Sequence, residues 1–264
     1  MKDHPYIVIM AGGVGSRFWP YSKSSKPKQF LDVLGTGRTL LQMTFDRFRE
    51  IAPAEQFYVV TNQAHAGLVS EQLPELLDHQ ILAEPLRKNT AACLAYAAYK
   101  ISNLDPNATM VVAPADHLIL QEGRFLQTLV TSIAAAQVHN RLLTIGIKPN
   151  RPETGYGYIQ YLQNEEDKEV LKVKTFTEKP NAKLATTFLE SGDFVWNSGM
   201  FVWKVESLIQ AFRKYMPDLA DVFEEGKSQF GTSTEADFIA TAYTTLKNIS
   251  IDYGIMEKSD QVFV

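Results

Sequence analysis

The sequence contains one cysteine, no long apolar run and no excess of basic residues. Cys93 cannot form a disulfide within the chain, and its apolar neighbours in AACLAYAAY indicate a buried helical position. No segment approaches the roughly 20 apolar residues of a membrane span, and the short N-terminal apolar run lacks the pattern of a signal peptide. We therefore expect no membrane partner and a cytoplasmic location.

The charge of the chain is nearly balanced. Its 264 residues include 26 Lys and Arg against 30 Asp and Glu, a formal net charge of −4, and the basic residues are scattered. Nucleic-acid binding requires clustered positive charge on one face, so we expect no nucleic-acid partner. A hydrophobic content of 45% over this length can supply a substantial core.

Short apolar runs alternate with helical segments through the first 150 residues. This alternation predicts an α/β fold with a mostly parallel sheet and helices on both faces, and ligands at the carboxyl ends of the strands. The runs are residues 6–10, 57–60, 80–83, 109–113 and 142–147, and the helical segments are 39–51, 89–104 and 123–140.

After residue 150 the pattern changes to strand-like stretches at 153–163, 170–180 and 196–205, followed by helices through 205–247. No linker or repeat separates the two parts. We interpret residues 1–264 as a single domain, in which residues 151–264 complete a mixed sheet begun by residues 1–150.

The segment MAGGVGSRFWPYSKSSKPKQF, residues 10–30, follows the first predicted strand. Glycines at this place let phosphate oxygens approach the backbone N–H groups. The spacing fits neither the dinucleotide motif, whose third glycine would fall at Phe18, nor the P-loop. Arg17, Lys26 and Lys28 supply cations suited to a triphosphate, although a glycine turn with solvated cations is an alternative.

Seven motifs resemble those of the sugar-1-phosphate nucleotidyltransferases, and Trp19-Pro20 and Gln29-Phe30 resemble the mannose-1-phosphate guanylyltransferase branch. They run in order along almost the whole chain, and the resemblance implies a Rossmann-like, glycosyltransferase-A-like sheet. They are AGGVGSRFWP with KPKQF, EPLRKNTA (84–91), PADH (114–117), TGYGYI (154–159), FTEKP (176–180), WNSGMF (196–201) and SIDYGIMEK (250–258).

Two carboxylates follow strands in the first half. Asp116 is a magnesium ligand by resemblance, since Mg²⁺ prefers carboxylate oxygen, but it could instead cap a turn. Glu84 can accept hydrogen bonds from N1–H and the exocyclic amine of guanine. We therefore expect Glu84, Asn89 and Thr90 to contact the base and ribose; alternatively Asn89 or Thr90 caps a helix. His117 is expected to pack or support rather than bind the metal.

The resemblance assigns the sugar phosphate to the second half. Lys179 would hold the phosphate and Glu178 the sugar hydroxyls, with a weak surface ion pair as the alternative. Gly157 would allow the sugar close to the backbone, and Asn197 could bridge two hydroxyls; otherwise both are turn residues. Asp252 is grouped with these sugar-side residues.

The implied reaction joins GTP and α-D-mannose 1-phosphate, with Mg²⁺, to give GDP-mannose and pyrophosphate. A phosphate oxygen attacks the α-phosphorus of GTP in line, and no general base is required because the nucleophile is already anionic. Arg17 and Lys28 are the expected catalytic cations. The expected contacts to the nucleotide phosphates are Ala11, Gly12, Gly13, Gly15, Ser16 and Lys26.

One motif of the family is missing. Relatives carry a second metal-binding aspartate in Trp-x-Asp-x-Gly soon after the equivalent of residues 250–258, and the sequence has no such motif. We expect a catalytic domain cut short at its C-terminus, in which Asp252 could partly substitute. Two alternatives are a transferase for another sugar or base and a non-catalytic nucleotide-sugar-binding protein. A homodimer, common among relatives, is a further open prediction.

Overall fold

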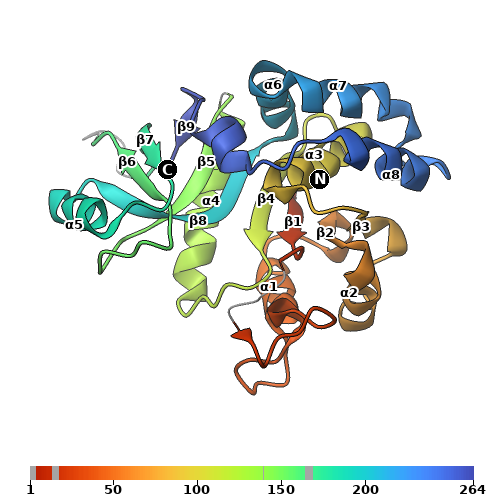
Figure 1. Ribbon diagram of the computed structural model, residues 1–264, viewed down its shortest axis with the longest axis horizontal. Helices are drawn as coiled ribbons and strands as arrows, with labels where there is room; N and C mark the ends of the chain where they lie inside the picture. The colour runs from red at the N-terminus through yellow and green to blue at the C-terminus, as the bar shows by residue number, and fades with distance from the viewer. Residues whose placement is uncertain (1–3, 14–17, 139, 164–168) are drawn as a thin grey trace.

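The computed structural model describes residues 4–13, 18–138, 140–163 and 169–264. Within these ranges, nine strands form one sheet with the central order β3-β2-β1-β4-β8-β5-β9, and β6 pairs with both β7 and β8 (Figure 1). The strands are β1 (Tyr6–Met10), β2 (Phe57–Asn62), β3 (Ile81–Glu84), β4 (Thr109–Pro114), β5 (Leu142–Ile147), β6 (Tyr158–Tyr161), β7 (Val173–Thr177), β8 (Phe194–Lys204) and β9 (Val262–Phe263).

The sheet is mixed. Strands β3, β2, β1 and β4 are parallel neighbours, and β5 and β9 also run parallel. Strand β8 is antiparallel to β4, β5 and β6, so it joins the strands of the first 150 residues to those that follow. The predicted α/β fold, a mixed sheet flanked by helices, is confirmed, and each predicted apolar run forms a strand.

Helices cover both faces of the sheet. The three helical segments predicted in the first half are α1, α3 and α4, and the helices predicted after residue 205 are α6, α7 and α8. The bounds are α1 (Leu40–Phe48), α2 (Ala66–Gln72), α3 (Asn89–Leu104), α4 (Glu122–Gln137), α5 (Ala182–Ser191), α6 (Val205–Tyr215), α7 (Pro217–Glu225) and α8 (Glu235–Thr245), followed by a π-helical turn, Asp252–Met256. Across the described ranges, no helix is both long and apolar enough to cross a membrane.

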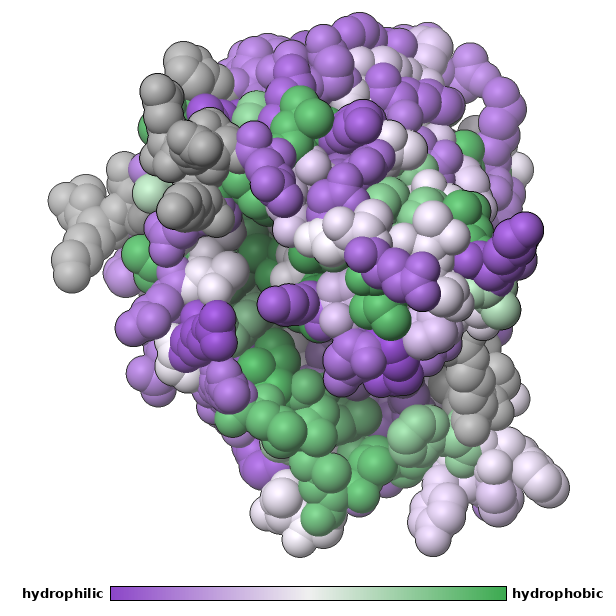
Figure 2. Space-filling view, turned by 90° about the vertical axis from the view of Figure 1, so that its left-hand side faces the viewer, coloured by the Kyte–Doolittle hydropathy of each residue, from purple (hydrophilic) through white to green (hydrophobic). Residues whose placement is uncertain are grey.

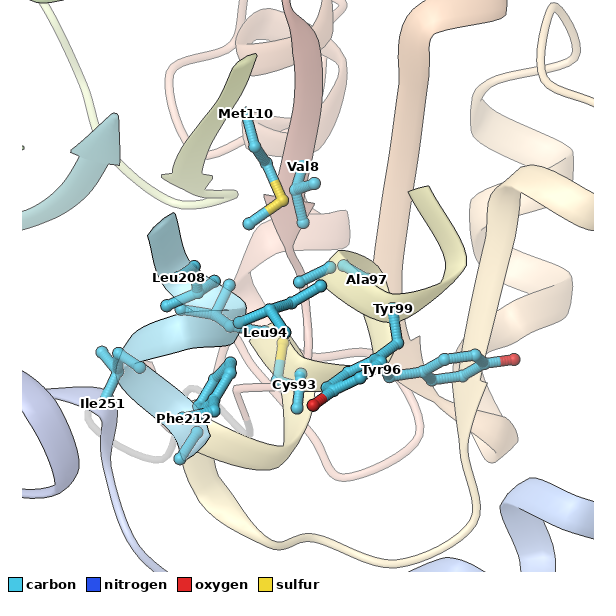
Figure 3. Packing of buried hydrophobic residues seen from close by; sticks show 14 of the residues in the cluster. Val8, Cys93, Leu94, Tyr96, Ala97, Tyr99, Met110, Leu208, Phe212 and Ile251 are labelled. Atoms are coloured by element: carbon cyan, nitrogen blue, oxygen red, sulfur yellow. The ribbon is translucent and has the colours of Figure 1, made fainter. Parts of the chain in front are cut away.

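Alternate residues of β1 face different helices, as the period of a strand requires. Ile7 and Ile9 belong to the cluster that includes Phe45 of α1, whereas Val8 packs with Leu94 of α3 on the other face. Figure 1 shows α6, α7 and α8 on one side of the sheet and α1, α2 and α4 on the other. Figure 3 shows α3 and α6 packed together over the strands, with Cys93 inside this core as predicted.

Helix α5 lies between the strand-like stretches predicted at 170–180 and 196–205, and no element was predicted for its residues. Its centre, ATTF, is rich in β-branched and aromatic residues that favour extended backbone. Two residues mark the helix ends: the Asn181 side chain accepts a hydrogen bond from the Leu184 N–H, and Gly192 has the left-handed conformation typical of a helix C-terminus. Figure 2 shows the side of the molecule that carries α5, largely hydrophilic above and with an apolar region below.

A buried ion pair fixes α8 against α3. The Lys100 Nζ lies 2.6 Å and 2.7 Å from the two carboxylate oxygens of Glu235. Glu235 also accepts hydrogen bonds from the Tyr96 hydroxyl at 3.0 Å and from the Gly231 N–H at 2.7 Å. Both partners are almost fully buried, so each needs the other to offset its desolvation.

Replacing one partner of this pair should cost more than replacing both. Lys100→Met leaves the Glu235 carboxylate buried without its cation, and we expect it to lower the free energy of unfolding by about 3–5 kcal/mol. The double variant Lys100→Met/Glu235→Gln should recover much of the loss, because the amide oxygen still accepts from Tyr96. Urea unfolding followed by circular dichroism measures both; a double variant as unstable as the single one would contradict the prediction.

Candidate functional site

Five of the nine predicted nucleotide-binding residues meet in a cavity at the carboxyl ends of β1, β3 and β4, and Ala11 is buried next to it without lining it. The volume of the cavity is about 520 Å³. Its lining includes seven of the residues chosen from the sequence: Gly12, Gly13, Glu84, Asn89, Thr90, Asp116 and Asp252. These ends coincide because parallel strands all finish at the same edge of the sheet.

A buried glutamine holds the segment that follows β1. The Gln29 side chain is 2% exposed, and its Nε2 donates to the Ala11 carbonyl at 2.7 Å and the Gly13 carbonyl at 2.8 Å. The Thr61 hydroxyl also donates to the Ala11 carbonyl, at 3.1 Å. Both carbonyls therefore accept hydrogen bonds from buried side chains, and these bonds fix the backbone where the cavity begins.

Three residues of the predicted phosphate loop, Gly15, Ser16 and Arg17, lie outside the described residues. Lys26 is described and exposed; it forms an isolated bridge with Lys23 and does not line the cavity.

The Lys28 ammonium and the Asp116 carboxylate form an ion pair at the cavity. Lys28 Nζ lies 2.7 Å from Asp116 Oδ2, and the two side chains are 26% and 29% exposed. The ammonium also lies over the Phe18 ring, 5.4 Å from its centroid. Lys28 is thus not a solvated cation on a glycine turn: the fold brings it to the carboxylate 88 positions away in the sequence.

The Asp116 carboxylate fits a divalent cation that is shared with substrate phosphates. Its oxygens can act as metal ligands, its side chain is partly exposed, and it lines the cavity. The described residues contain no group of three or more His, Cys, Asp or Glu side chains that could hold a metal by themselves. Mg²⁺ is commonly held by one or two carboxylates plus phosphates and water, which is the arrangement that this site permits.

His117 lies beside the ion pair. Its Nε2 lies 3.8 Å from Asp116 Oδ1. Burial lowers the pKa of His117, with Asp116 opposing the shift and Lys28 adding to it. The neutral form of the imidazole is therefore favoured, and the packing or supporting role of His117 stays a prediction.

Glu84 is buried at the end of β3, close to the first glycines. Its side chain accepts a hydrogen bond from the Tyr243 hydroxyl at 3.0 Å. Its other oxygen lies only 3.3 Å from the position that a Cβ on Gly12 would occupy. Burial raises the pKa of Glu84 to about 7, while the bond from Tyr243 opposes that rise. The carboxyl group therefore changes its ionisation near neutral pH.

The start of α3 is bonded both by its own first residue and by a distant segment. The Asn89 Oδ1 accepts a hydrogen bond from the Thr90 N–H at 2.8 Å, and Asn89 has a left-handed φ of 68°, so its side chain bonds the first turn as the capping alternative allows. The residue before it, Lys88, has no side-chain cap. The Thr90 hydroxyl accepts from the Ile251 N–H at 2.9 Å, and the Ala91 N–H donates to the Ile249 carbonyl at 3.2 Å. This docking brings the 249–252 segment to the edge of the cavity.

The residues predicted for the sugar phosphate form a second group beside the cavity. A Cβ at Gly157 would lie 2.6 Å from the Glu178 carboxylate, so a side chain there would displace that group. The Asn197 N–H donates to the Gly157 carbonyl at 2.8 Å, and Asn197 lies inside β8, so the turn alternative for this residue is wrong. Lys179 pairs with Glu178; Lys179 is 55% exposed and Glu178 15%.

Asp252 connects this group to the cavity. It lines the cavity, and its Oδ1 accepts from the Asn197 Nδ2 at 2.9 Å. Burial, then the charge of Glu178, raise the pKa of Asp252 to about 6, and the bond from Asn197 opposes them. Asp252 therefore belongs to both groups: it lines the cavity and bonds Asn197 of the sugar-side group.

Ten lining residues were not predicted as site residues. Besides Lys88, four of them have polar or thiol side chains that could contact a ligand: Gln29, Arg87, Cys93 and Asn248. Arg87 lies within the quoted EPLRKNTA motif, and Cys93 lies one helical turn after Asn89 and Thr90, so motif position and helical spacing could have indicated both. Asn248 has no such signal, since only the docking of its segment against α3 brings it here.

The sequence model of the nucleotidyl transferase family matches residues 6–242, which is most of the chain. The chain belongs to this family. The predicted family membership is thus confirmed, and the cavity with its glycine segment is the candidate site of a nucleotidyl transferase.

Two relatives match nearly the whole chain. It is 39% identical over 267 residues to the mannose-1-phosphate guanylyltransferase of Escherichia coli, covering 97% of this chain and 56% of that protein. It is 38% identical over 262 residues to the xanthan biosynthesis protein XanB of Xanthomonas campestris pv. campestris (strain ATCC 33913), covering 97% and 54%. The chain spans about half the length of the curated relatives it matches.

Two solved structures share the fold of this nucleotidyl transferase. One, from Thermus thermophilus, is described as a mannose-1-phosphate geranyltransferase; its TM-score is 0.86 at 31% identity, over 98% of this chain and 72% of that one. The other, described as a mannose-6-phosphate isomerase from Helicobacter pylori, has a TM-score of 0.78 at 27% identity, over 98% and 96%.

The buried carboxyl of Glu84 should make stability depend on pH. Because its pKa is raised from the ordinary 4.5 to about 7, the folded protein holds a proton that the unfolded chain releases. Its contribution to the free energy of unfolding is therefore highest below pH 4.5 and falls as pH rises to 7, by on the order of 3 kcal/mol. Glu84→Gln should remove this slope, as measured by urea unfolding from pH 4.5 to 7.5.

The matched control is Glu190→Gln, an exposed position on α5. Its stability should follow that of the unmodified protein at every pH. Parallel pH curves for Glu84→Gln and the unmodified protein would show that Glu84 does not titrate as described.

Proposed function

We propose that the protein transfers GMP from GTP to α-D-mannose 1-phosphate, giving GDP-mannose and pyrophosphate. One observation carries the proposal: the Asn197–Asp252 hydrogen bond of 2.9 Å joins the sugar-side group to the cavity with the glycine segment. A transferase needs both substrates at one place, because positioning supplies much of its rate. The name of the Escherichia coli relative supports mannose 1-phosphate and the guanylyl group.

The guanine end of GTP is assigned to Glu84 with Asn89 and Thr90. An ionised carboxylate accepts from both N1–H and the 2-amino group of guanine, an edge that adenine and uracil do not present. Glu84 lines the cavity, and its pKa of about 7 lets it ionise at neutral pH. The triphosphate is assigned to Ala11, Gly12 and Gly13, whose carbonyls Gln29 holds in part.

The sugar phosphate is assigned to Gly157, Glu178, Lys179 and Asn197. Lys179 is the exposed cation of this group, and Glu178 is mostly buried beside it. A cation suits a phosphate dianion, and carboxylate and amide groups suit hydroxyls. The absence of a side chain at Gly157 leaves the Glu178 carboxylate its place.

The chemistry follows from charge and position. The sugar phosphate oxygen is already anionic, so no residue is required to remove a proton from it. Lys28 supplies positive charge next to Asp116 and is assigned to the α-phosphate and the leaving pyrophosphate. Asp116 would hold Mg²⁺, which when bound neutralises charge on phosphate oxygens. Gly15, Ser16, Arg17 and Lys26 keep their predicted roles at the triphosphate.

The proposal includes the predicted division of labour, with residues 1–150 binding the nucleotide and 151–264 the sugar phosphate. The shared sheet, in which β8 joins the two parts, supports one working unit. The proposed partners are GTP, mannose 1-phosphate and their products; the cytoplasmic location and the homodimer stay predictions.

Pyrophosphate release tests this function. With mannose 1-phosphate and Mg²⁺, we expect release from GTP in preference to UTP and ATP. Asp116→Ala and Lys28→Met should each lower kcat by about 10²-fold or more, because each removes charge complementary to the reacting phosphates. Asp218→Ala, which breaks the exposed Asp218–Lys247 pair, is the control and should keep full activity.

Three results would contradict the proposal in different ways. Equal release from UTP would indicate a transferase for another base, and release only with another sugar 1-phosphate would change the acceptor. Binding of GDP-mannose without any release would indicate a nucleotide-sugar-binding protein.

A further inference from the structure

Tyr243 reaches the nucleotide cavity from the far end of the chain. It is fully buried on α8, and its hydroxyl donates to Glu84 Oε1 at 3.0 Å across 159 residues of sequence. Glu84 lines the cavity, whereas Tyr243 itself does not. The Glu84 carboxylate is therefore the direct contact between Tyr243 and the lining of the cavity.

The hydroxyl of Tyr243 has a fixed position. Helix α8 is tied to α3 by the buried Lys100–Glu235 pair. The Tyr243 ring also makes an edge contact with the Tyr96 ring, with 6.5 Å between centroids. Because α3 also lines the cavity through Asn89, Thr90 and Cys93, the tyrosine is fixed to the same element that forms the cavity wall.

The contact leaves one carboxylate oxygen of Glu84 facing the glycine segment. Tyr243 donates to Oε1, while Oε2 lies 3.3 Å from the position of a Cβ on Gly12. A carboxylate has about four lone-pair sites, so one bond from Tyr243 orients the group and leaves the other sites for a ligand. The two oxygens of a carboxylate are always coplanar, but a freely rotating group would not keep that plane aligned with the edge of a base.

We propose that Tyr243 is a positioning residue that sets the preference for guanine, by holding the Glu84 carboxylate where it accepts both hydrogens of the guanine edge. This inference rests on the proposed function. The ligand chemistry that it selects is a purine nucleotide with a donor at N1 and a 2-amino group. Adenine has neither donor in that arrangement, and hypoxanthine has only the first.

The surroundings of Glu84 determine the direction of a pH effect. From α8, Tyr243 donates to the carboxylate and lowers its pKa, against the larger effect of burial. The titratable groups of α3 near it are Cys93 and Tyr96, both themselves subject to the charge of Glu84, and Arg87 and Lys88 line the same cavity. Loss of the tyrosine hydroxyl should therefore raise the pKa of Glu84.

The test compares Tyr243→Phe with the unmodified protein on GTP, ITP and ATP, with mannose 1-phosphate and Mg²⁺. We expect kcat/KM for GTP to fall about 10- to 100-fold, because a hydrogen bond to a charged group is lost. The ratio of kcat/KM for GTP to kcat/KM for ITP should fall toward one. The KM for mannose 1-phosphate should change by less than about twofold. The rising limb of kcat/KM for GTP should move to higher pH, since ionised Glu84 is required.

Two further variants separate positioning from general packing. Tyr96→Phe removes a neighbouring buried hydroxyl that bonds Glu235 rather than Glu84. It should leave unchanged both the nucleotide preference and the pH at which kcat/KM for GTP rises. Tyr243→Phe added to Glu84→Gln should cause no further loss of preference, because the tyrosine acts through that carboxylate. Melting temperatures establish that each variant is folded.

The outcomes distinguish this inference from the function on which it rests. Equal losses with GTP, ITP and ATP, or a pH limb that does not move, would overturn the positioning role and make Tyr243 a packing residue. An unmodified protein that releases no pyrophosphate from any triphosphate would overturn the proposed function, and the inference with it.

Discussion

The backbone hydrogen bonds of β8 to β4, β5 and β6 determine where the two groups of site residues meet. The end of this strand at Lys204 pairs with β4, and its beginning at Phe194 pairs with β6. Asn197 lies between these contacts, where its side chain reaches Asp252. A single antiparallel strand thus sets the distance between the sugar-side group and the carboxyl edge of the parallel strands.

Buried carboxyl groups determine much of the electrostatics of the cavity. Glu84 and Asp252 both line the cavity, and burial is the main cause of the raised pKa of each. Ionisation of either group lowers the free energy of unfolding, and groups with shifted pKa values are common at functional sites. In the same cavity, the Asp116 carboxylate lies beside the Lys28 ammonium. The cavity thus combines the carboxyl groups of Glu84, Asp116 and Asp252 with cations, because Arg87 and Lys88 also line it and Lys28 lies beside Asp116.

Local sequence patterns predicted most of the fold. The run YIVIM and the span 89–104 became β1 and α3 with the predicted bounds, because apolar content and helical spacing there agree with the packing. Helix α5 was not predicted, because Thr186, Thr187 and Phe188 interrupt residues that otherwise favour a helix. Asn181 and Gly192 mark its ends. The motifs also located most of the cavity lining, since residues that follow parallel strands must share one edge.

Contacts between distant segments were not predictable in the same way. The Lys28–Asp116 pair, the role of Gln29 under the glycine segment and the Tyr243–Glu84 bond each depend on tertiary packing. No spacing rule connects a tyrosine on α8 to a carboxylate at the end of β3. The same holds for Asn197 and Asp252, whose separate motifs do not reveal that their side chains bond.

A crystal structure with bound GDP-mannose tests the central claim, that the two groups of residues form one site. The account predicts guanine against Glu84, the diphosphate beside Lys28 and Asp116, and mannose between Gly157, Glu178 and Asn197. Mannose bound away from the second group, or guanine bound away from Glu84, would contradict it.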